Sequence, residues 1–324
     1  ANVKVRLKDK LLQRLGWMPR CKPIVLPMYT RSTDQGRTFS EPVVLGAVPA
    51  SDNSDIVKGG LANAECFGTM TIDDRGGVYA YWIDTRDMSK DVANGKIFSA
   101  VSTDDGRTFS KDFEVFPSDA CPCCQITATA ANGRIYMGSR QVSAKGTRDS
   151  VVAVSTDRGR TFQPRVRWGG SEWTIEGCPL KPTALAVDGE SIYAAAFDGG
   201  ATPQGAYLSR STDGGKSFAP AVLLHPGAAV SDAPVVAVLA GKVVAAWHAK
   251  AGGERRIYVS VSRDRGATFS APAEMPAPAG AGIYPVLALR GGGLQVAWQQ
   301  GDAIMTRYLA GNDPLLTARA VAAQ

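Results

Sequence analysis

Ser102-Thr103-Asp104-Asp105-Gly106-Arg107-Thr108-Phe109 is one of five copies of a single eight-residue pattern. The other copies begin at Ser32, Ser155, Ser211 and Ser262, so successive starts differ by 70, 53, 56 and 51 residues. The Asp can accept hydrogen bonds from backbone N–H groups two or more residues later, and the Gly supplies the positive φ of a tight turn. The pattern therefore predicts five equivalent structural turns, each ending in a Phe that packs between neighbouring repeats.

The sequence around each turn repeats as well. Three short β-rich runs precede a turn, as in residues 66–72, 77–82 and 96–101, and a fourth run follows it, as in residues 221–224. A last trio at residues 285–309 has no turn after it. Four strands in about 50 residues are typical of a blade of a β-propeller.

The five turns resemble the Asp boxes, or BNR repeats, of sialidase-like six-bladed β-propellers, and the resemblance covers nearly the whole chain. Together with the strand runs it implies an all-β, six-bladed propeller in which residues 1–324 form one domain. Residues 7–18 have helical spacing, and the segment 1–20 is expected to pack on the ring or close it, with residues 3–7 as the missing strand of the last blade.

Composition excludes several classes of protein. The chain has 324 residues, of which 44% are hydrophobic and 20% charged, so it is not intrinsically disordered. It has no apolar run of about 18 residues that could span a membrane. The net charge of +6 is spread along the chain without interleaved aromatic residues, which argues against a nucleic-acid partner.

In a propeller, the start of each first strand and the end of each second strand lie on one face, and the five turns lie on the opposite face. All six cysteines fall just before a first strand, in four consecutive repeats. We therefore expect them to converge at the mouth of the central channel. They are Cys21, Cys66, Cys121, Cys123, Cys124 and Cys178.

Three interpretations of these cysteines stay open. Disulfides between adjacent blades, such as Cys121 with Cys178, would suit a periplasmic or secreted protein, although this chain shows no signal peptide. Thiolates could instead hold copper or zinc, with Met18, Met70 and Met137 as candidate thioether ligands. A redox or nucleophilic thiol would need a histidine nearby, and the candidates are His225 and His248.

The resemblance also implies a catalytic set to compare with this chain. Sialidases hold the substrate carboxylate with three arginines and use a Tyr nucleophile, a Glu that assists it and an Asp acid/base. Arg140 matches one arginine, and Tyr284 resembles the nucleophile. Lys22 and Asp232 stand near the places of the other two arginines, and Glu176 is a candidate for the displaced Glu. We therefore expect the scaffold of a sialidase without its reaction.

Two further groups are expected on the same face. Asp84 and Arg86 follow a second strand and could bind a polar ligand or form a salt bridge between blades. Trp168 and Trp173 could stack on a sugar ring or cover the core.

The sequence favours an extracytoplasmic binding protein with a soft-metal or redox cysteine site. Its partner at this face would be a small ligand, a metal ion or a protein. The alternatives are an exo-α-sialidase-type glycoside hydrolase and a disulfide-braced glycan- or protein-binding module without catalysis.

Overall fold

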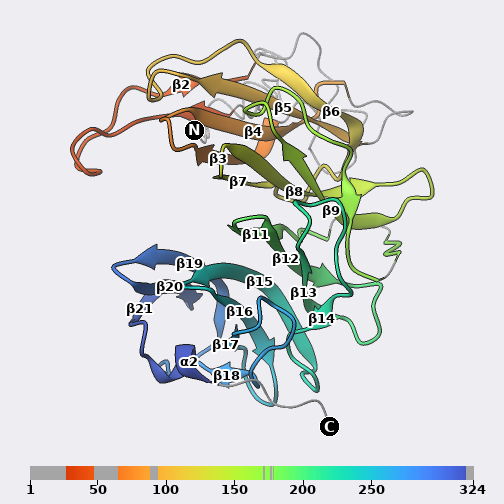
Figure 1. Ribbon diagram of the computed structural model, residues 1–324, viewed down its shortest axis with the longest axis vertical. Helices are drawn as coiled ribbons and strands as arrows, with labels where there is room; N and C mark the ends of the chain where they lie inside the picture. The colour runs from red at the N-terminus through yellow and green to blue at the C-terminus, as the bar shows by residue number, and fades with distance from the viewer. Residues whose placement is uncertain are drawn as a thin grey trace, which may run out of the picture.

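The computed structural model describes residues 27–46, 65–87, 94–170, 172–175, 177 and 179–318, with the backbone alone for residues 65–67. Within these ranges the chain consists of antiparallel strands and one short helix, α2 (Pro314–Thr317). The sheets follow one another around an arc, from β1 and β2 to β19, β20 and β21 (Figure 1). The expectation of an all-β protein is confirmed. None of the described helical residues form a segment long and apolar enough to cross a bilayer.

Strands pair in chain order within each unit of the arc. The first unit contains β1 (Met28–Tyr29) and β2 (Val43–Val44), and the second contains β3 (Glu65–Ile72), β4 (Val78–Asp84), β5 (Gly95–Ser102) and β6 (Phe113–Ala120). The third contains β7 (Thr127–Ala131), β8 (Arg134–Val142), β9 (Arg148–Ser155) and β10 (Val166–Arg167), and the fourth contains β11 (Thr183–Asp188), β12 (Ser191–Asp198), β13 (Gly205–Ser211) and β14 (Val222–Leu223). The fifth contains β15 (Val230–Leu239), β16 (Lys242–Lys250), β17 (Arg256–Ser262) and β18 (Ala273–Glu274), and the last contains β19 (Gly282–Arg290), β20 (Gly293–Gln300) and β21 (Ala303–Leu309).

Neighbouring units contact one another through their first strands. Along the chain β3 contacts β7, β7 contacts β11, β11 contacts β15 and β15 contacts β19, so these strands form the inner side of the arc (Figure 1). The second and third units are also joined by a bridge between Ala120 at the end of β6 and Gln141 in β8. This bridge makes one continuous eight-stranded sheet of the two units.

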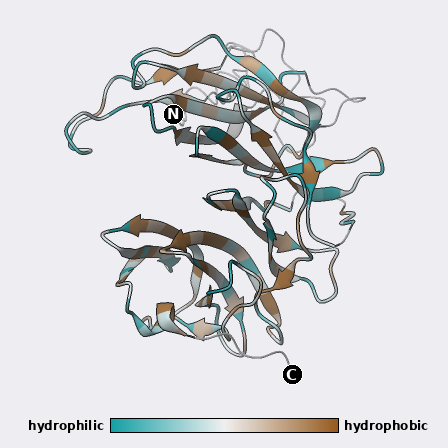
Figure 2. Cartoon of the chain, in the orientation of Figure 1, coloured by the Kyte–Doolittle hydropathy of each residue, from teal (hydrophilic) through white to brown (hydrophobic). Residues whose placement is uncertain are grey.

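The core lies between the units. Every residue of β4 is buried, and β8, β12 and β16 are buried over most of their length, so the second strands are apolar on both faces (Figure 2). One buried cluster combines Tyr81 and Ile97 of the second unit with Ile135 of the third. Another combines Val244 of the fifth unit with Leu294 of the last. Because such strands need cover on both sides, each unit is stabilised by its neighbours.

The five predicted turns share one set of hydrogen bonds. In the turn from β17 to β18, the Ser262 hydroxyl donates to Asp264 Oδ1 at 2.7 Å and accepts from the Gly266 N–H at 2.7 Å. Thr268 donates to Asp264 through its N–H at 2.9 Å and through its hydroxyl at 2.6 Å. The turns that begin at Ser32, Ser102, Ser155 and Ser211 repeat this arrangement. The Asp therefore accepts hydrogen bonds from the N–H groups three and four residues later. The Gly at the fifth position of the pattern has a positive φ in every copy.

The Phe that ends each turn behaves as expected in four copies. Phe109, Phe162, Phe218 and Phe269 pack against buried clusters. Phe39 is different, because it is 62% exposed among the described residues. The prediction that every copy packs its Phe between repeats is therefore wrong for the first copy, whose described unit contains only the short strands β1 and β2.

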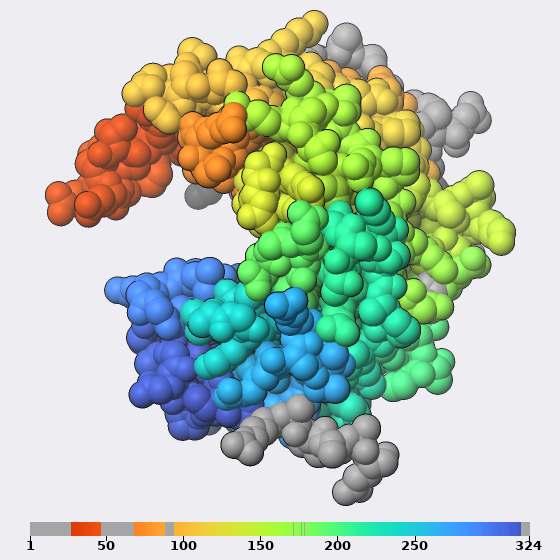
Figure 3. All heavy atoms as spheres, in the orientation of Figure 1, coloured from red at the N-terminus to blue at the C-terminus, as the bar shows by residue number. Residues whose placement is uncertain are grey.

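The two ends of the arc lie opposite each other across an open notch in the space-filling view (Figure 3). The expected closing segment 1–20, with the strand at residues 3–7 and the helical stretch at 7–18, lies outside the described residues. The described part of the last unit has three strands and then α2.

Replacing a turn carboxylate tests the role of these hydrogen bonds. We expect Asp264→Asn to lower the free energy of unfolding by about 1–2 kcal/mol at pH 7, because Asn replaces one of the two accepting carboxylate oxygens with an NH2 group, which donates and cannot accept. Burial alone would raise the pKa of Asp264, but hydrogen bonds from Thr268, Ser262 and Ala267 lower it to about 2. The contribution of the carboxylate is therefore present above about pH 4 and lost as the pH falls toward 2.

Urea denaturation of wild type and Asp264→Asn between pH 7 and pH 2 measures this difference. Asp302→Asn is the matched control, because Asp302 is exposed in the β20–β21 turn, and it should change stability by no more than about 0.5 kcal/mol. A gap between wild type and Asp264→Asn that stays constant down to pH 2 would contradict the interpretation.

Candidate functional site

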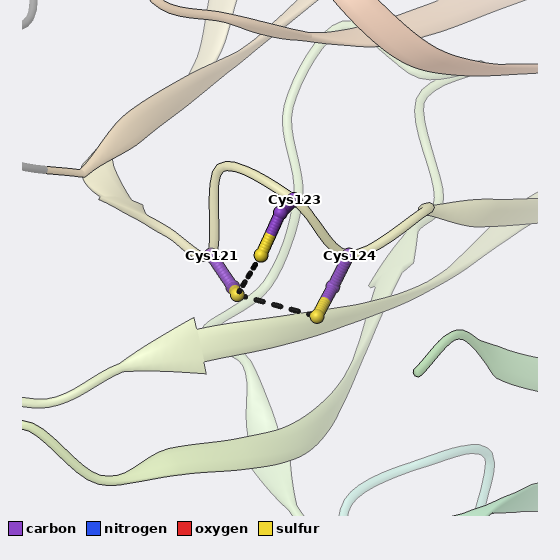
Figure 4. Close-up of side chains that lie close together, drawn as sticks. All are labelled: Cys121, Cys123 and Cys124. Atoms are coloured by element: carbon purple, nitrogen blue, oxygen red, sulfur yellow. Dashed lines mark hydrogen bonds between the residues drawn. The ribbon is translucent and has the colours of Figure 1, made fainter. Parts of the chain in front are cut away.

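Three cysteines gather in the tight turn that connects β6 to β7 (Figure 4). The Cys121 N–H donates to the Arg140 carbonyl at 2.9 Å, and the Cys124 N–H donates to the Cys121 carbonyl at 3.3 Å. Cys121 Sγ lies 3.2 Å from Cys124 Sγ and 3.7 Å from Cys123 Sγ, and all three sulfurs lie within 4.8 Å of one another. The residues are only 1–2% exposed. Four consecutive residues thus direct three thiols to one buried point.

Cys121, Cys123 and Cys124 are present as thiols in this structure. Cys178, the partner expected for Cys121, lies outside the described residues, so a disulfide between these two cysteines stays a prediction. Cys21 also lies outside the described residues, and Cys66 belongs to β3, where it pairs with Ile83, while its side chain is not described. The structure thus brings together the three cysteines of one turn and leaves the convergence of all six as a prediction.

Hydrogen bonds make the thiols electrostatically unequal. Hydrogen bonds between Cys121 Sγ and the sulfurs of Cys123 and Cys124, together with the Arg148 Nη1 group that donates to Cys121 Sγ at 3.2 Å, hold the pKa of Cys121 well below its ordinary value. The hydrogen bond to Cys121 raises the pKa of Cys124 to about 11. Negative charge at the cluster is therefore concentrated on Cys121.

Arg140 lies directly beside this turn, and its side chain is engaged inside the protein. Its guanidinium donates to the carbonyls of Arg148 at 2.6 Å, Phe197 at 3.0 Å and Lys181 at 3.3 Å, and it stacks on the Trp173 ring at 5.0 Å. The residue is 3% exposed, and burial lowers its pKa. This arginine therefore ties three segments together beside the thiols.

Lys181 links the cysteine turn to the next units. Its backbone N–H bonds to Cys124, and its ammonium group forms a short ion pair with Asp232 Oδ2 while lying 5.0 Å from the centre of the Phe197 ring. The Lys181 side chain is 26% exposed, and that of Asp232 is 12% exposed. Asp232 stands where the resemblance led us to look for an arginine, so the charge at that place is negative and already paired.

His248 and Tyr284 form a second contact at the same ends of the strands. The Tyr284 N–H donates to His248 Nδ1 at 3.2 Å, and the two rings meet edge to face at 5.5 Å. Tyr284 is 60% exposed and has a φ of +53°, in a bulge of β19 between Ile283 and Val286. A left-handed conformation at a non-glycine residue stores strain and is frequent at functional sites. The proposed Tyr nucleophile is therefore displayed at the surface.

The remaining candidates have structural contacts. Arg86 pairs with Asp84 and with Asp112 at 2.7 Å and stacks on Phe98, so these two salt bridges lie within the second unit. Trp168 is 6% exposed and packs against Phe218.

Trp173, Met137 and His225 also make contacts inside the protein. Trp173 packs against Phe197 and under the Arg140 guanidinium, and Met137 is buried in the core of the second and third units. His225 accepts a hydrogen bond from Trp247 Nε1 at 3.2 Å. Met70 is 49% exposed on β3, whereas Glu176 and Met18 lie outside the described residues.

Arg148 and Lys181 are the site residues that sequence reasoning missed. Arg148 begins β9, directly beside the end of β8, where Val142 pairs with it. The repeat pattern could have placed Arg148 at the same ends of the strands as the cysteines. Its approach to one particular sulfur was not, because this contact depends on the shape of the turn at residues 121–124.

Comparisons with known proteins support the fold. No family model matches the chain, and no curated protein matches it. Among solved structures it is similar to a Hadza microbial sialidase, with a TM-score of 0.56 and 16% identity over 86% of this chain and 58% of that one. The chain therefore spans less than two thirds of that sialidase.

Two other similar structures match a larger share of their own length. An ulvan lyase, described as a new family of polysaccharide lyase, has a TM-score of 0.58 and 15% identity over 87% of this chain and 74% of that one. An α-L-arabinofuranosidase of Fusarium graminearum has a TM-score of 0.51 and 16% identity over 79% of each chain. All of these neighbours have propeller-type folds, so the chain shares that general fold.

The two histidines allow a direct measurement at the site. Burial lowers the pKa of His248 to about 4, against a smaller opposing effect of Asp232, and burial also lowers that of His225. Since the unfolded imidazole titrates near 6.5, we expect stability to fall as the pH drops from about 6.5 toward 4, because the unfolded state takes up protons first.

NMR titration of the imidazole signals checks this expectation. The chain contains two histidines, so His225→Gln and His248→Gln assign both signals. His248→Gln should also lose less stability than wild type between pH 6.5 and pH 4.5. A His248 signal that titrates at pH 6 or above would contradict the buried, neutral imidazole.

Proposed function

We propose that this protein is an extracytoplasmic six-bladed β-propeller that binds a soft metal ion, copper or zinc, through cysteine thiolates at the mouth of its channel. The observation that carries the proposal is the buried convergence of three thiols in the turn at residues 121–124. The proposed blades are the six units of strands described above, and the segment at residues 3–7 would complete the last one.

The topology supports one functional face. In an antiparallel unit, the start of the first strand and the end of the second lie at the same edge, and the turn between the third and fourth strands lies at the other. The cysteine turn precedes β7, Arg140 is near the end of β8, and Tyr284 is near the start of β19. The five Asp-box turns follow β1, β5, β9, β13 and β17, which supports their placement on the opposite face.

The distances fit a metal–thiolate site. A zinc ion with sulfur ligands at about 2.3 Å in a tetrahedron separates those sulfurs by about 3.8 Å. The Cys121 and Cys123 sulfurs are 3.7 Å apart, and the Cys121 and Cys124 sulfurs are 3.2 Å apart. Small side-chain rotations would therefore place all three as ligands. Thiolates are also the ligands that Cu(I) prefers.

Charge around the turn supports the same proposal. Thiolates bound to a metal leave a net negative charge that a buried site must offset. Arg148 donates to Cys121 Sγ, and the buried Arg140 is attracted to Cys121 and Cys124. Cys21, Cys66 and Cys178 remain candidates for further ligands. Cys178 precedes Lys181, which bonds to Cys124, by three residues.

Metal binding by cysteine variants tests the proposal. Reduced wild-type protein should bind one Cu(I) or Zn(II) ion per chain, and Cys124→Ser should weaken binding by at least about a hundredfold, since one of a few ligand bonds is lost. Met275→Leu is the matched control, because Met275 is buried in the core between the fifth and last units and should leave affinity unchanged. Chelator competition and elemental analysis give the affinity and the stoichiometry.

Two results would decide against metal. One is a purified protein that contains no metal, takes up none and shows no titratable thiols after denaturation, which would favour the disulfide-braced binding module. The other is a Cys124→Ser protein with wild-type affinity. Cys178→Ser then decides whether the ligand set extends beyond the turn, because loss of affinity in that variant would add it as a ligand.

A glycoside hydrolase is the second candidate, favoured by the similar sialidase and arabinofuranosidase structures and by the exposed, strained Tyr284. Its set would be Tyr284 as nucleophile, Arg140 as carboxylate ligand and Glu176 as the assisting carboxylate. The three carbonyl contacts of Arg140 weigh against it, because they occupy the guanidinium. We therefore expect no turnover of a fluorogenic sialoside. Turnover that is abolished by Tyr284→Phe would reverse the order of the two proposals.

A further inference from the structure

We propose that Cys121 and Cys124 form a reversible disulfide, and that this bond and a bound metal ion exclude each other. The first half of the inference depends only on the geometry of the turn. The second half rests on the metal site proposed above. The two halves can be measured separately.

The spacing and the turn favour this pair among the three cysteines. Cys121 and Cys124 are the first and last residues of a turn closed by the hydrogen bond from the Cys124 N–H to the Cys121 carbonyl. The α-carbons of such a turn lie within about 7 Å, and a disulfide needs a separation of about 4.4–6.8 Å. The two sulfurs are 3.2 Å apart, so an approach of about 1.2 Å gives the bond length of about 2.05 Å.

The third thiol is placed less favourably. Cys123 Sγ is 3.7 Å from Cys121 Sγ, and its residue lies inside the turn and not at its end. Oxidation of the end pair would therefore leave Cys123 as a single thiol. The Arg148 guanidinium, 3.2 Å from Cys121 Sγ, favours negative charge on that sulfur and makes Cys121 the attacking group.

The burial of the three thiols limits which oxidants can reach them. Thiols that are 1–2% exposed do not admit a bulky disulfide such as oxidised glutathione, but a hydroperoxide as small as hydrogen peroxide can reach them. The Cys121 thiolate attacks one peroxide oxygen and the O–O bond breaks, which gives a sulfenic acid and hydroxide. Hydroxide takes the Cys124 proton and leaves as water.

The second step closes the bond. The Cys124 thiolate attacks Cys121 Sγ, the S–S bond forms and the S–O bond breaks. The departing hydroxide takes a proton from solvent, which replaces the one that Cys121 lost when it ionised. In total two thiols and one hydrogen peroxide give one disulfide and two water molecules, so both thiols are oxidised and the peroxide is reduced. A dithiol reductant reverses the change.

The disulfide and the metal compete for the same sulfurs. A disulfide removes two of the three thiolates of the turn, and Cys123 alone cannot retain a soft metal ion against competing ligands. A bound metal in turn withdraws Cys121 and Cys124 from peroxide. The site would therefore release its metal on oxidation and recover it after reduction.

Mass spectrometry of the full-length, metal-free protein tests the pairing. Trypsin cleaves after Lys111 and Arg134, so residues 112–134 form one peptide that contains Cys121, Cys123 and Cys124 and no other cysteine. After treatment with hydrogen peroxide, this peptide should be lighter by two hydrogen atoms in wild type and in Cys123→Ser, and a dithiol should restore its mass. Cys121→Ser and Cys124→Ser should not show that loss.

Other results would overturn the pairing. A peptide that gains only oxygen atoms shows that the thiols oxidise without joining. A two-hydrogen loss that persists in Cys124→Ser shows that Cys121 pairs with Cys123. Either result leaves the metal proposal standing, because metal affinity is measured on reduced protein.

A second experiment tests whether the disulfide and the metal exclude each other, and it uses wild-type protein loaded with Cu(I) or Zn(II). We expect disulfide formation to be at least about tenfold slower than in the metal-free protein, and peroxide to release metal in step with the loss of two hydrogens. A disulfide that forms equally fast with metal bound, or metal that stays bound to the disulfide form, would overturn the exclusion. A protein that forms the disulfide and binds no metal would overturn the proposed function and the exclusion that rests on it, and would leave the Cys121–Cys124 pairing standing.

Discussion

Burial of the second strand in the second to fifth units is the constraint on which the structure depends. β4 is buried along its whole length, and β8, β12 and β16 are buried over most of theirs, so none can be left at a surface. One neighbouring unit covers one face only. The units must therefore stack in series, and the inner strands β3, β7, β11, β15 and β19 are brought side by side along the arc.

This packing explains why the polar and sulfur chemistry collects where it does. Strand interiors are filled by apolar contacts, so reactive side chains are left to the ends of strands and to the turns between units. The turns between third and fourth strands carry Asp residues whose carboxylates are occupied by the turn itself. The connections around the first strands differ from unit to unit, and they supply the cysteine turn, the Lys181–Asp232 pair and the His248–Tyr284 contact.

The repeat made the strands and turns predictable, because each depends on local sequence. The strand predicted at residues 303–309 is β21, and the hydrogen bonds of the Ser262 turn follow from its Asp, Gly and Thr. The meeting of Cys121, Cys123 and Cys124 was also predictable, since they are neighbours in the chain. The contacts of Arg140 were not, because its three carbonyl partners come from separate segments. A resemblance in sequence identified the arginine, and only the packing around it revealed how its guanidinium is used.

The bridge between Ala120 and Gln141 limits how the second and third units move relative to each other. It joins these units into one sheet, and the hydrogen bond from the Cys121 N–H to the Arg140 carbonyl extends the connection by one residue. Because backbone hydrogen bonds in one continuous sheet open cooperatively, we expect the two units to open as a single foldon and not as two hinged parts. The thiols therefore lie where backbone hydrogen bonds connect two described units, so that motion between other units of the arc would leave the spacing of their sulfurs unchanged.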